Sequence, residues 1–409
     1  MIPWRRVIAL ADMDAFFASV EQLDQPYLRS RAVVITSRHQ GSCVISCSYE
    51  ARSYGIKVGM PIFEAKQLCP LLVQCISRSD RYAEISDCIM HALKSKITPM
   101  IEQSSIDEAY LDLTAEQQLY ESHQHMVEHI RCVVYQASGL SVSVGLSGDK
   151  TTAKFAAKQN KPHGYMIIPP HEACLALADV PVAELCGIGQ GMQSFLAGLG
   201  VHHCQDMRNI PISVLSKRFG RIGRRVWYMC LGQDPDPVDV RYRQPKTLGH
   251  SKVLPPHTSN HATILAYCHY LTGRLAKRLR DHSLKSTEFS LGMKSYSRDW
   301  ISQRMVLTQA TNDNVIIQKL FLDWLNTYHK HHEAVSHLYI TAMNLQQLQQ
   351  LSLNGQQQSK INATLDAIHE RYGLKGVMSA RLVDVYQEIN SVVPFGYHAN
   401  KKLFSHTSV

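Results

Sequence analysis

At residues 104–113 the chain reads Ser-Ser-Ile-Asp-Glu-Ala-Tyr-Leu-Asp-Leu, with two adjacent acids, Asp107 and Glu108, at the front of a short apolar strand. Two ionised carboxylates in a partly buried place repel each other, and one takes up a proton unless a cation lies between them. Mg²⁺ is the natural candidate, because it prefers oxygen ligands and keeps positions open for water and phosphate. The stretch therefore predicts a divalent metal site at a strand end.

A second acid-tipped strand lies upstream. The apolar run Val7–Ala11 is typical of a buried strand and leads into Asp12-Met13-Asp14. If the two strand ends are neighbours, Asp12, Asp107 and Glu108 form one cluster. Either acidic segment alone is more often a solvated turn, but together they suit two metal ions about 4 Å apart, as phosphoryl and nucleotidyl transfer require.

This interpretation sets a geometric condition. Adjacent residues of a regular strand point to opposite faces, so Asp107 and Glu108 share a site only where the strand starts or bends. The polar run 103–105 makes a turn plausible at that point.

Length and composition indicate a globular protein of two to four domains, since the chain has 409 residues and is 45% hydrophobic. No uninterrupted apolar stretch approaches the ~20 residues that span a bilayer, and residues 1–6 lead straight into a core strand. We therefore expect a cytoplasmic protein without a membrane segment or signal peptide. Eleven cysteines without a Cys-x-x-Cys pair favour reduced thiols over disulfides or structural zinc.

Positive charge is concentrated near the C-terminal end. Residues 241–345 contain fourteen Lys and Arg but six Asp and Glu, an excess of eight within a chain of net charge +9. A solvated face usually mixes its signs, whereas this excess is typical of a surface that binds a polyanion.

Alternating apolar patterns predict a mixed α/β sheet in the first 168 residues and a helical segment at 173–232. In the helical segment, Leu185-Cys186-Gly187-Ile188-Gly189 followed by Leu199-Gly200-Val201 has the spacing of a helix-hairpin-helix, in which backbone N–H groups hold a phosphate. A plain helical turn is the alternative. An extended polar linker then precedes helices at 262–280 and 314–328 and strands at 289–296, 305–308 and 337–342, a βαββαβ order.

Four blocks together resemble the Y-family translesion DNA polymerases, and within them the bacterial DNA polymerase IV group. They begin at Asp12-Met13-Asp14, Tyr49-Glu50-Ala51-Arg52, Ser105-Ile106-Asp107-Glu108 and Asn160-Lys161-Pro162, in the family's order. The resemblance implies an α+β right-hand polymerase with a ferredoxin-like palm, small fingers, a helical thumb and a βαββαβ little finger. The implied ranges are palm 1–20 and 78–168, fingers 21–77, thumb 169–233, linker 234–249, little finger 250–345, and clamp peptide and tail 346–409.

The resemblance implies a low-fidelity, template-directed polymerase that acts as a monomer on primer-template DNA and dNTPs with two Mg²⁺ ions. Asp12, Asp107 and Glu108 would be the side-chain metal ligands and the catalytic residues, joined by the Met13 carbonyl. Phe17 matches the steric gate against a ribose 2′-OH; a core aromatic is the alternative for Phe17, although Phe16 suits that core position better. The residues implied to contact the nucleotide are Phe16, Phe17, Ser46, Tyr49, Arg52 and Lys161.

Contacts with DNA and with a sliding clamp follow from the same resemblance. Near the C-terminus Gln350, Leu351 and Leu353 resemble a clamp-binding peptide, although Asn354 stands where its final aromatic is expected. Residues 360–372 have an amphipathic helical pattern, suited to docking on the protein itself or on a partner. The candidate DNA-phosphate contacts are Gly187, Gly189, Lys246, Arg298 and Arg304; Gln190 replaces a basic residue often found in the hairpin.

Two other classes are open. A catalytically silent DNA-binding scaffold with a polymerase fold would not need the three carboxylates, which are all present. A nucleotidyl cyclase built on a similar palm would not need a hairpin thumb or a basic domain.

The resemblance also marks a departure at Ile45, where the family usually has a small residue such as Ser or Ala over the nascent base pair. The larger side chain is expected to tighten the pocket and to narrow the range of bulky lesions accepted. Ile45→Ala should therefore extend bypass of bulky minor-groove adducts, measured as primer extension across a set of adducted templates. Unchanged bypass of every adduct would refute this hypothesis.

Overall fold

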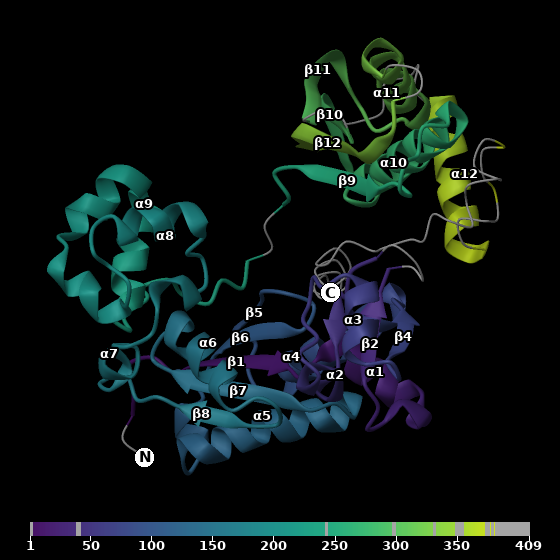
Figure 1. The fold of residues 1–409 in the computed structure, drawn as a ribbon. Coiled ribbons are helices and arrows are strands. Elements are labelled where there is room, and N and C mark those ends of the chain that lie inside the picture. The colour runs from purple at the N-terminus through teal and green to yellow at the C-terminus, as the bar shows by residue number, and fades with distance from the viewer. Residues whose placement is uncertain are drawn as a thin grey trace. The chain divides into compact units, whose positions relative to one another are not determined.

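The chain forms two compact units, Met1–Tyr242 with Val392–Val409, and Arg243–Ser391, which we describe separately (Figure 1). No helix of the described residues is long and apolar enough to cross a membrane. The computed structural model describes residues 3–37, 42–241, 244–296, 300–329, 333–347, 356–372, 377 and 380.

The first unit is built on a five-stranded mixed sheet of order β5-β6-β1-β7-β8. Its central strand β1 pairs antiparallel with β6 and β7, and β7 pairs parallel with β8. The strands are β1 (Ile8–Met13), β5 (Ile101–Gln103), β6 (Glu108–Asp112), β7 (Val142–Ser147) and β8 (Tyr165–Ile167).

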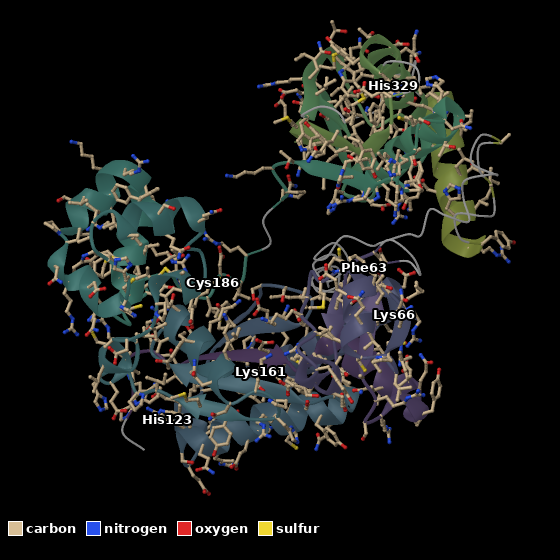
Figure 2. All side chains as sticks on the ribbon, viewed as in Figure 1. Phe63, Lys66, His123, Lys161, Cys186 and His329 are labelled. Atoms are coloured by element: carbon tan, nitrogen blue, oxygen red, sulfur yellow. The ribbon has the colours of Figure 1, made fainter. Side chains whose placement is uncertain are left out.

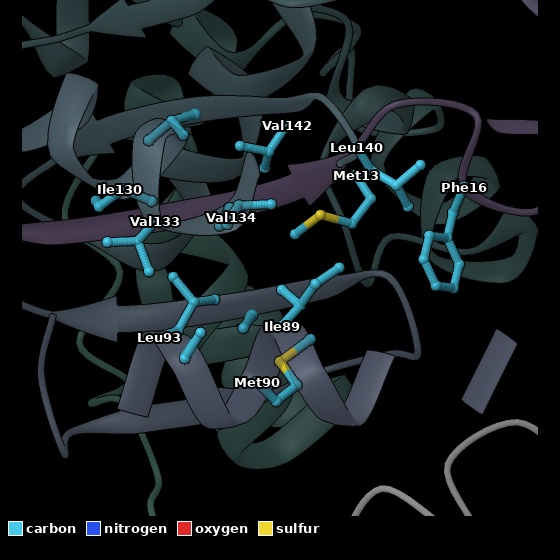
Figure 3. Close-up of a cluster of buried hydrophobic side chains, with 14 of the residues drawn as sticks. Met13, Phe16, Ile89, Met90, Leu93, Ile130, Val133, Val134, Leu140 and Val142 are labelled. Carbon is cyan, nitrogen blue, oxygen red and sulfur yellow. The ribbon is translucent and has the colours of Figure 1, made fainter. Parts of the chain in front are cut away.

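The two faces of this sheet follow from alternation along β1. Ala9, Ala11 and Met13 enter the large core under α4 and α5, part of which is shown in Figure 3. Ile8 and Leu10 point to the opposite face and pack with α6. The helices of the palm are α4 (Ser79–Lys96), α5 (His123–Ser138) and α6 (Lys150–Gln159), with a 3₁₀ turn at Gln117–Leu119.

The small fingers region has a three-stranded sheet, β3-β2-β4, with a core of its own. The helix that begins at Phe16 ends at Asp24, because Pro26 cannot continue it and opens a 3₁₀ turn instead. The elements are α1 (Phe16–Asp24), a 3₁₀ turn (Pro26–Leu28), β2 (Val33–Thr36), β3 (Ser46–Cys47), α2 (Tyr49–Ser53), α3 (Ile62–Leu68) and β4 (Val73–Ile76).

The thumb region is helical, as predicted, and its core is separate from those of the palm. Its longest helix bends at Gly220, whose φ of 60° lies in the left-handed region that glycine tolerates. The elements are α7 (Ala173–Ala176), α8 (Gln190–Ala197), α9 (Ile212–Cys230) and the 3₁₀ turns Val182–Glu184 and Cys204–Asn209.

The first half of the predicted linker is packed against the palm. The Asp234 carboxylate accepts hydrogen bonds from Arg225 Nε and Nη2 at 2.9 and 2.8 Å and from the Thr151 hydroxyl at 2.8 Å. Val238 is buried with the core residues beneath α6. Residues 234–238 therefore belong structurally to the first unit.

The second unit has the predicted βαββαβ order and a four-stranded antiparallel sheet, β11-β10-β12-β9. Its first strand begins at Leu248, inside the range predicted for the linker. The elements are β9 (Leu248–Val253), α10 (His261–Asp281), β10 (Leu284–Ser295), β11 (Trp300–Thr311), α11 (Asn314–Tyr328), β12 (Val335–Gln347) and α12 (Gln356–Tyr372).

Helix α12 matches the predicted amphipathic helix and docks on its own unit. Asp366 accepts two hydrogen bonds from the Arg280 guanidinium, at 2.6 and 2.8 Å, and Asn362 donates one to Asp313. The bidentate pair joins α12 to α10, so the docking is on the protein itself.

Candidate active site

The register of β1 and β6 brings Asp12 and Glu108 together. The two residues are directly opposite each other in the antiparallel pair, where side chains lie about 5 Å apart. Side chains alternate along β1, so Asp12 lies on the same face as Ile8 and Leu10. By the same alternation along β6, Glu108 lies on the face of Tyr110, which packs with Ile8 and Leu10. Both carboxylates therefore lie on the face of the sheet that α6 covers.

Asp107 lies in the turn just before β6. Ser104 and Ser105 donate backbone hydrogen bonds to the Glu108 carbonyl, and Met13 N donates to the Asp107 carbonyl at 2.9 Å. The Ser105 hydroxyl donates to Asp107 Oδ1 at 2.6 Å. Glu108 is the first residue of its strand, so the geometric condition set by the sequence is met.

Two lysines neutralise two of the carboxylates. Lys154, on α6, donates to both Glu108 oxygens at 2.8 and 2.9 Å. Lys161, labelled in Figure 2, donates to Asp12 Oδ1 at 2.5 Å and to the Met13 carbonyl at 3.3 Å. Lys154 lies on α6, which covers this face of the sheet, and Lys161 lies in the loop that follows α6.

Burial raises the pKa of Asp12, and the neighbouring carboxylates Asp107 and Glu108 raise it further, whereas the Lys161 ammonium opposes both effects. Burial alone would lower the pKa of Lys154, but its ion pair with Glu108 outweighs this and leaves that pKa raised. The site thus concentrates negative charge, which the two lysine ammonium groups partly offset.

Among the described residues, no group of three or more His, Cys, Asp or Glu side chains is arranged to hold a metal ion. The lysine ammonium groups instead lie at the Asp12 and Glu108 oxygens. The donor set still fits a hard divalent cation, because it consists of carboxylate oxygens and the Met13 carbonyl at the adjoining ends of β1 and β6.

The sequence missed the role of Asp14, which is 2% exposed. Its carboxylate accepts hydrogen bonds from the Ser141 and Ser143 hydroxyls at 2.9 and 2.8 Å, and from His163 N at 2.9 Å. These bonds commit its oxygens to strand β7, to the residue before it and to the loop that carries His163. The local sequence around Asp14 does not reveal these hydrogen bonds, because the donors lie at least 127 residues away along the chain.

The fingers residues Tyr49 and Arg52 lie on α2, whose first turn is capped by Ser48. The Arg52 guanidinium carbon lies 4.6 Å above the Tyr49 ring, and the Tyr49 hydroxyl lies 3.5 Å from Asp14 Oδ1. Burial, with Asp14 nearby, raises the pKa of Tyr49 to about 12, so its hydroxyl stays a donor at neutral pH. Ser46 is buried in β3.

The two phenylalanines are both buried. Phe16 lies in the same core as Met13 (Figure 3), and Phe17 stacks on Tyr82 with ring centroids 4.4 Å apart. Ile45 is half-buried and packs on the edge of the same core.

The described candidates for contacts with DNA phosphates in the thumb and little finger are exposed glycines or exposed basic side chains. Gly187 has a φ of 95°, and Gly189 precedes α8; a Cβ at either would meet no atom within 4 Å. Lys246 is exposed and precedes β9. Arg304 forms an ion pair with the buried Glu288, so a DNA phosphate would compete with Glu288 for the Arg304 guanidinium. The candidates outside the described residues are Arg298, Gln350, Leu351 and Leu353.

Protein-family models match three segments of the chain. Residues 11–158 match the impB/mucB/samB family, and residues 245–355 match the C-terminal domain of that family. Residues 183–234 match the thumb domain of DNA polymerase iota.

Curated relatives match most of the chain. A DNA polymerase IV from Desulfatibacillum aliphaticivorans is 30% identical over 92% of this chain and 97% of its own length. The chain belongs to the Y-family DNA polymerases, in the DNA polymerase IV group. One from Moorella thermoacetica is 31% identical over 90% of this chain and 93% of its own. A DNA polymerase IV from Alkalilimnicola ehrlichii is 35% identical over 71% of this chain and 81% of its own.

The fold agrees with this assignment. A solved Y-family DNA polymerase chimera superposes with a TM-score of 0.72, covering 84% of this chain and all of the other, at 24% identity. The predicted right-hand fold is confirmed.

The contact between Lys161 and Asp12 predicts how the rate of nucleotide incorporation depends on pH. Asp12 must be ionised to bind a cation, so activity should fall as pH drops through its raised pKa. Lys161→Ala removes the cation that opposes this rise, so the acid limb of the pH–rate profile should move to higher pH. The measurement is single-nucleotide incorporation against pH at sub-saturating divalent metal.

Lys150→Ala is the matched control, because Lys150 pairs with Glu102 and does not touch Asp12. An acid limb at the same pH in the wild type and in Lys161→Ala would contradict the electrostatic account.

Proposed function

We propose that this protein is a low-fidelity, template-directed DNA polymerase that adds dNTPs to a primer 3′-OH and bypasses DNA lesions. The observation that carries the proposal is the cross-strand carboxylate pair Asp12 and Glu108, with Asp107 in the adjacent turn and two lysines facing them. A silent scaffold would have no reason to keep this concentration of half-buried carboxylates, whose mutual repulsion is costly.

Asp12, Asp107, Glu108 and the Met13 carbonyl would hold two Mg²⁺ ions. When bound, such a pair activates the attacking primer oxygen and stabilises the oxygen that leaves with pyrophosphate. The protein's contribution is to fix the carboxylates: strand register sets Asp12 against Glu108, and the turn at Ser104–Ser105 fixes Asp107.

Lys161 would exchange partners during nucleotide binding. Its ammonium now pairs with Asp12, and that carboxylate would turn to the cation while Nζ turns to a phosphate oxygen. Tyr49 and Arg52 would hold the triphosphate from the fingers, the hydroxyl as a neutral donor and the guanidinium as a forked one. These groups would stabilise the charge that develops on the leaving pyrophosphate.

The nucleotide pocket would be shaped by Phe17, Ser46 and Ile45. The Phe17 ring is held flat against Tyr82, which would give a rigid surface against a ribose 2′-OH. Ser46 would supply a hydroxyl, and Ile45 would close the pocket over the base pair.

DNA would be gripped mainly by its phosphates. The backbone N–H groups at Gly187 and Gly189 would contact the duplex from the thumb, and Lys246, Arg298 and Arg304 from the little finger. The segment Gln350 to Leu353 would bind a sliding clamp. The palm, fingers, thumb and little finger would occupy the ranges that the resemblance implies, with residues 234–238 packed on the palm and the little-finger sheet beginning at Leu248.

Primer extension with single-site variants tests the proposal. The wild type should incorporate dNTPs on a primed template with Mg²⁺, and Asp107→Ala and Glu108→Ala should each lower the rate at least about 100-fold, as loss of charge stabilisation at a reacting centre does.

Asp112→Ala is the matched control, because Asp112 lies at the other end of the same strand and bonds to Thr114. It should stay within a few-fold of the wild type. A wild type without incorporation, or carboxylate variants as active as the wild type, would overturn the proposal.

A further inference from the structure

The loop that carries Lys161 has a demanding backbone. It joins α6 to β8, and His163 within it has a φ of 60°, in the left-handed region that non-glycine residues avoid. At Gly164, a Cβ would lie 1.9 Å from the Asn160 carbonyl oxygen. Such a conformation costs free energy and persists only where surrounding contacts hold it.

Two side chains hold the backbone of His163, one at its N–H group and one at its carbonyl. Its N–H donates to Asp14 Oδ2 at 2.9 Å, and its carbonyl accepts from Arg131 Nη2 at 2.8 Å. Asp14 follows β1, whereas Arg131 belongs to α5. The Arg131 guanidinium carbon also lies 5.8 Å above the Tyr165 ring, just beyond the loop.

The Asp14 side of this grip is itself fixed. The Ser141 and Ser143 hydroxyls bond to both Asp14 carboxylate oxygens, and Asp14 N donates to the Ser141 carbonyl. The His163 peptide is thereby tied to the sheet on one side and to α5 on the other. Lys161 is two residues away, with its ammonium 2.5 Å from Asp12.

We propose that Arg131 and Asp14 are positioning residues that hold the His163 peptide and so place Lys161 at the nucleotide triphosphate. The inference rests on the proposed role of Lys161 in the polymerase reaction. Arg131 acts through the loop, because its hydrogen bonds go to His163. The carboxylates of the site are bonded to lysine and serine side chains and not to Arg131. Removing its guanidinium frees one side of the loop and lets the Lys161 ammonium move.

Arg131→Met tests the inference, because methionine keeps the apolar stem and removes the donor. Single-turnover incorporation separates the Kd for dNTP from the maximal rate. The variant should bind dNTP about tenfold more weakly, in line with losing a hydrogen bond from a charged group. Its affinity for primer-template DNA, measured by fluorescence anisotropy, should be unchanged.

Conservative variants separate the hydrogen bond from the residue's other properties. Arg131→Lys keeps a charged donor and should restore most of the dNTP affinity. Asparagine tolerates the left-handed backbone conformation, and His163→Asn leaves both backbone hydrogen bonds in place. This variant should therefore bind dNTP like the wild type. Glu128→Ala, one turn earlier on α5, controls for general loosening of the helix.

A double-mutant cycle with Lys161→Ala gives the decisive readout, because a purely structural effect would add to the loss of Lys161. If Arg131 acts through Lys161, adding Arg131→Met to Lys161→Ala should change the dNTP Kd less than twofold. Additive losses, or a dNTP Kd within twofold of wild type in Arg131→Met alone, would overturn the inference. A wild type that fails to incorporate dNTP would instead refute the proposed function.

Discussion

Mutual repulsion among three carboxylates at adjoining strand ends is the constraint on which the palm of this protein depends. Strand register places Asp12 and Glu108 opposite each other, and the turn before β6 adds Asp107. Burial makes the repulsion costly, so Lys154 and Lys161 are held against two of the three groups. A divalent cation would relieve the same repulsion and release the lysines.

The elements around the sheet serve this arrangement. Helix α6 lies so close to β7 that a Cβ on Gly145 would come within 2.0 Å of the Ala153 carbonyl oxygen, which brings Lys154 to Glu108. The Asp234 carboxylate ties the end of the thumb to the start of α6 through Arg225 and Thr151. Charge in the site and packing of the palm are therefore coupled through one helix.

Strands β1 and β6 were predictable, because each is a short apolar run with acidic residues at the end that forms the site. Local chemistry also explains why α1 ends at Asp24, since Pro26 follows it. Asp14 and Arg131 were not predictable from the sequence: their partners at Ser141, Ser143 and His163 are distant in the chain or belong to the backbone. The packed start of the linker was missed for the same reason, since a polar, proline-rich segment gives no sign of its tertiary contacts.

The central claim is that Asp12 would pass from Lys161 to a metal ion, while the Lys161 ammonium would turn to a phosphate of the bound nucleotide. Anomalous diffraction from crystals grown with Mn²⁺, primer-template DNA and a non-hydrolysable dNTP tests this directly. Manganese peaks should lie against Asp12, Asp107 and Glu108, with the Lys161 ammonium on a phosphate oxygen. Manganese bound elsewhere, with Lys161 still paired to Asp12, would contradict the account.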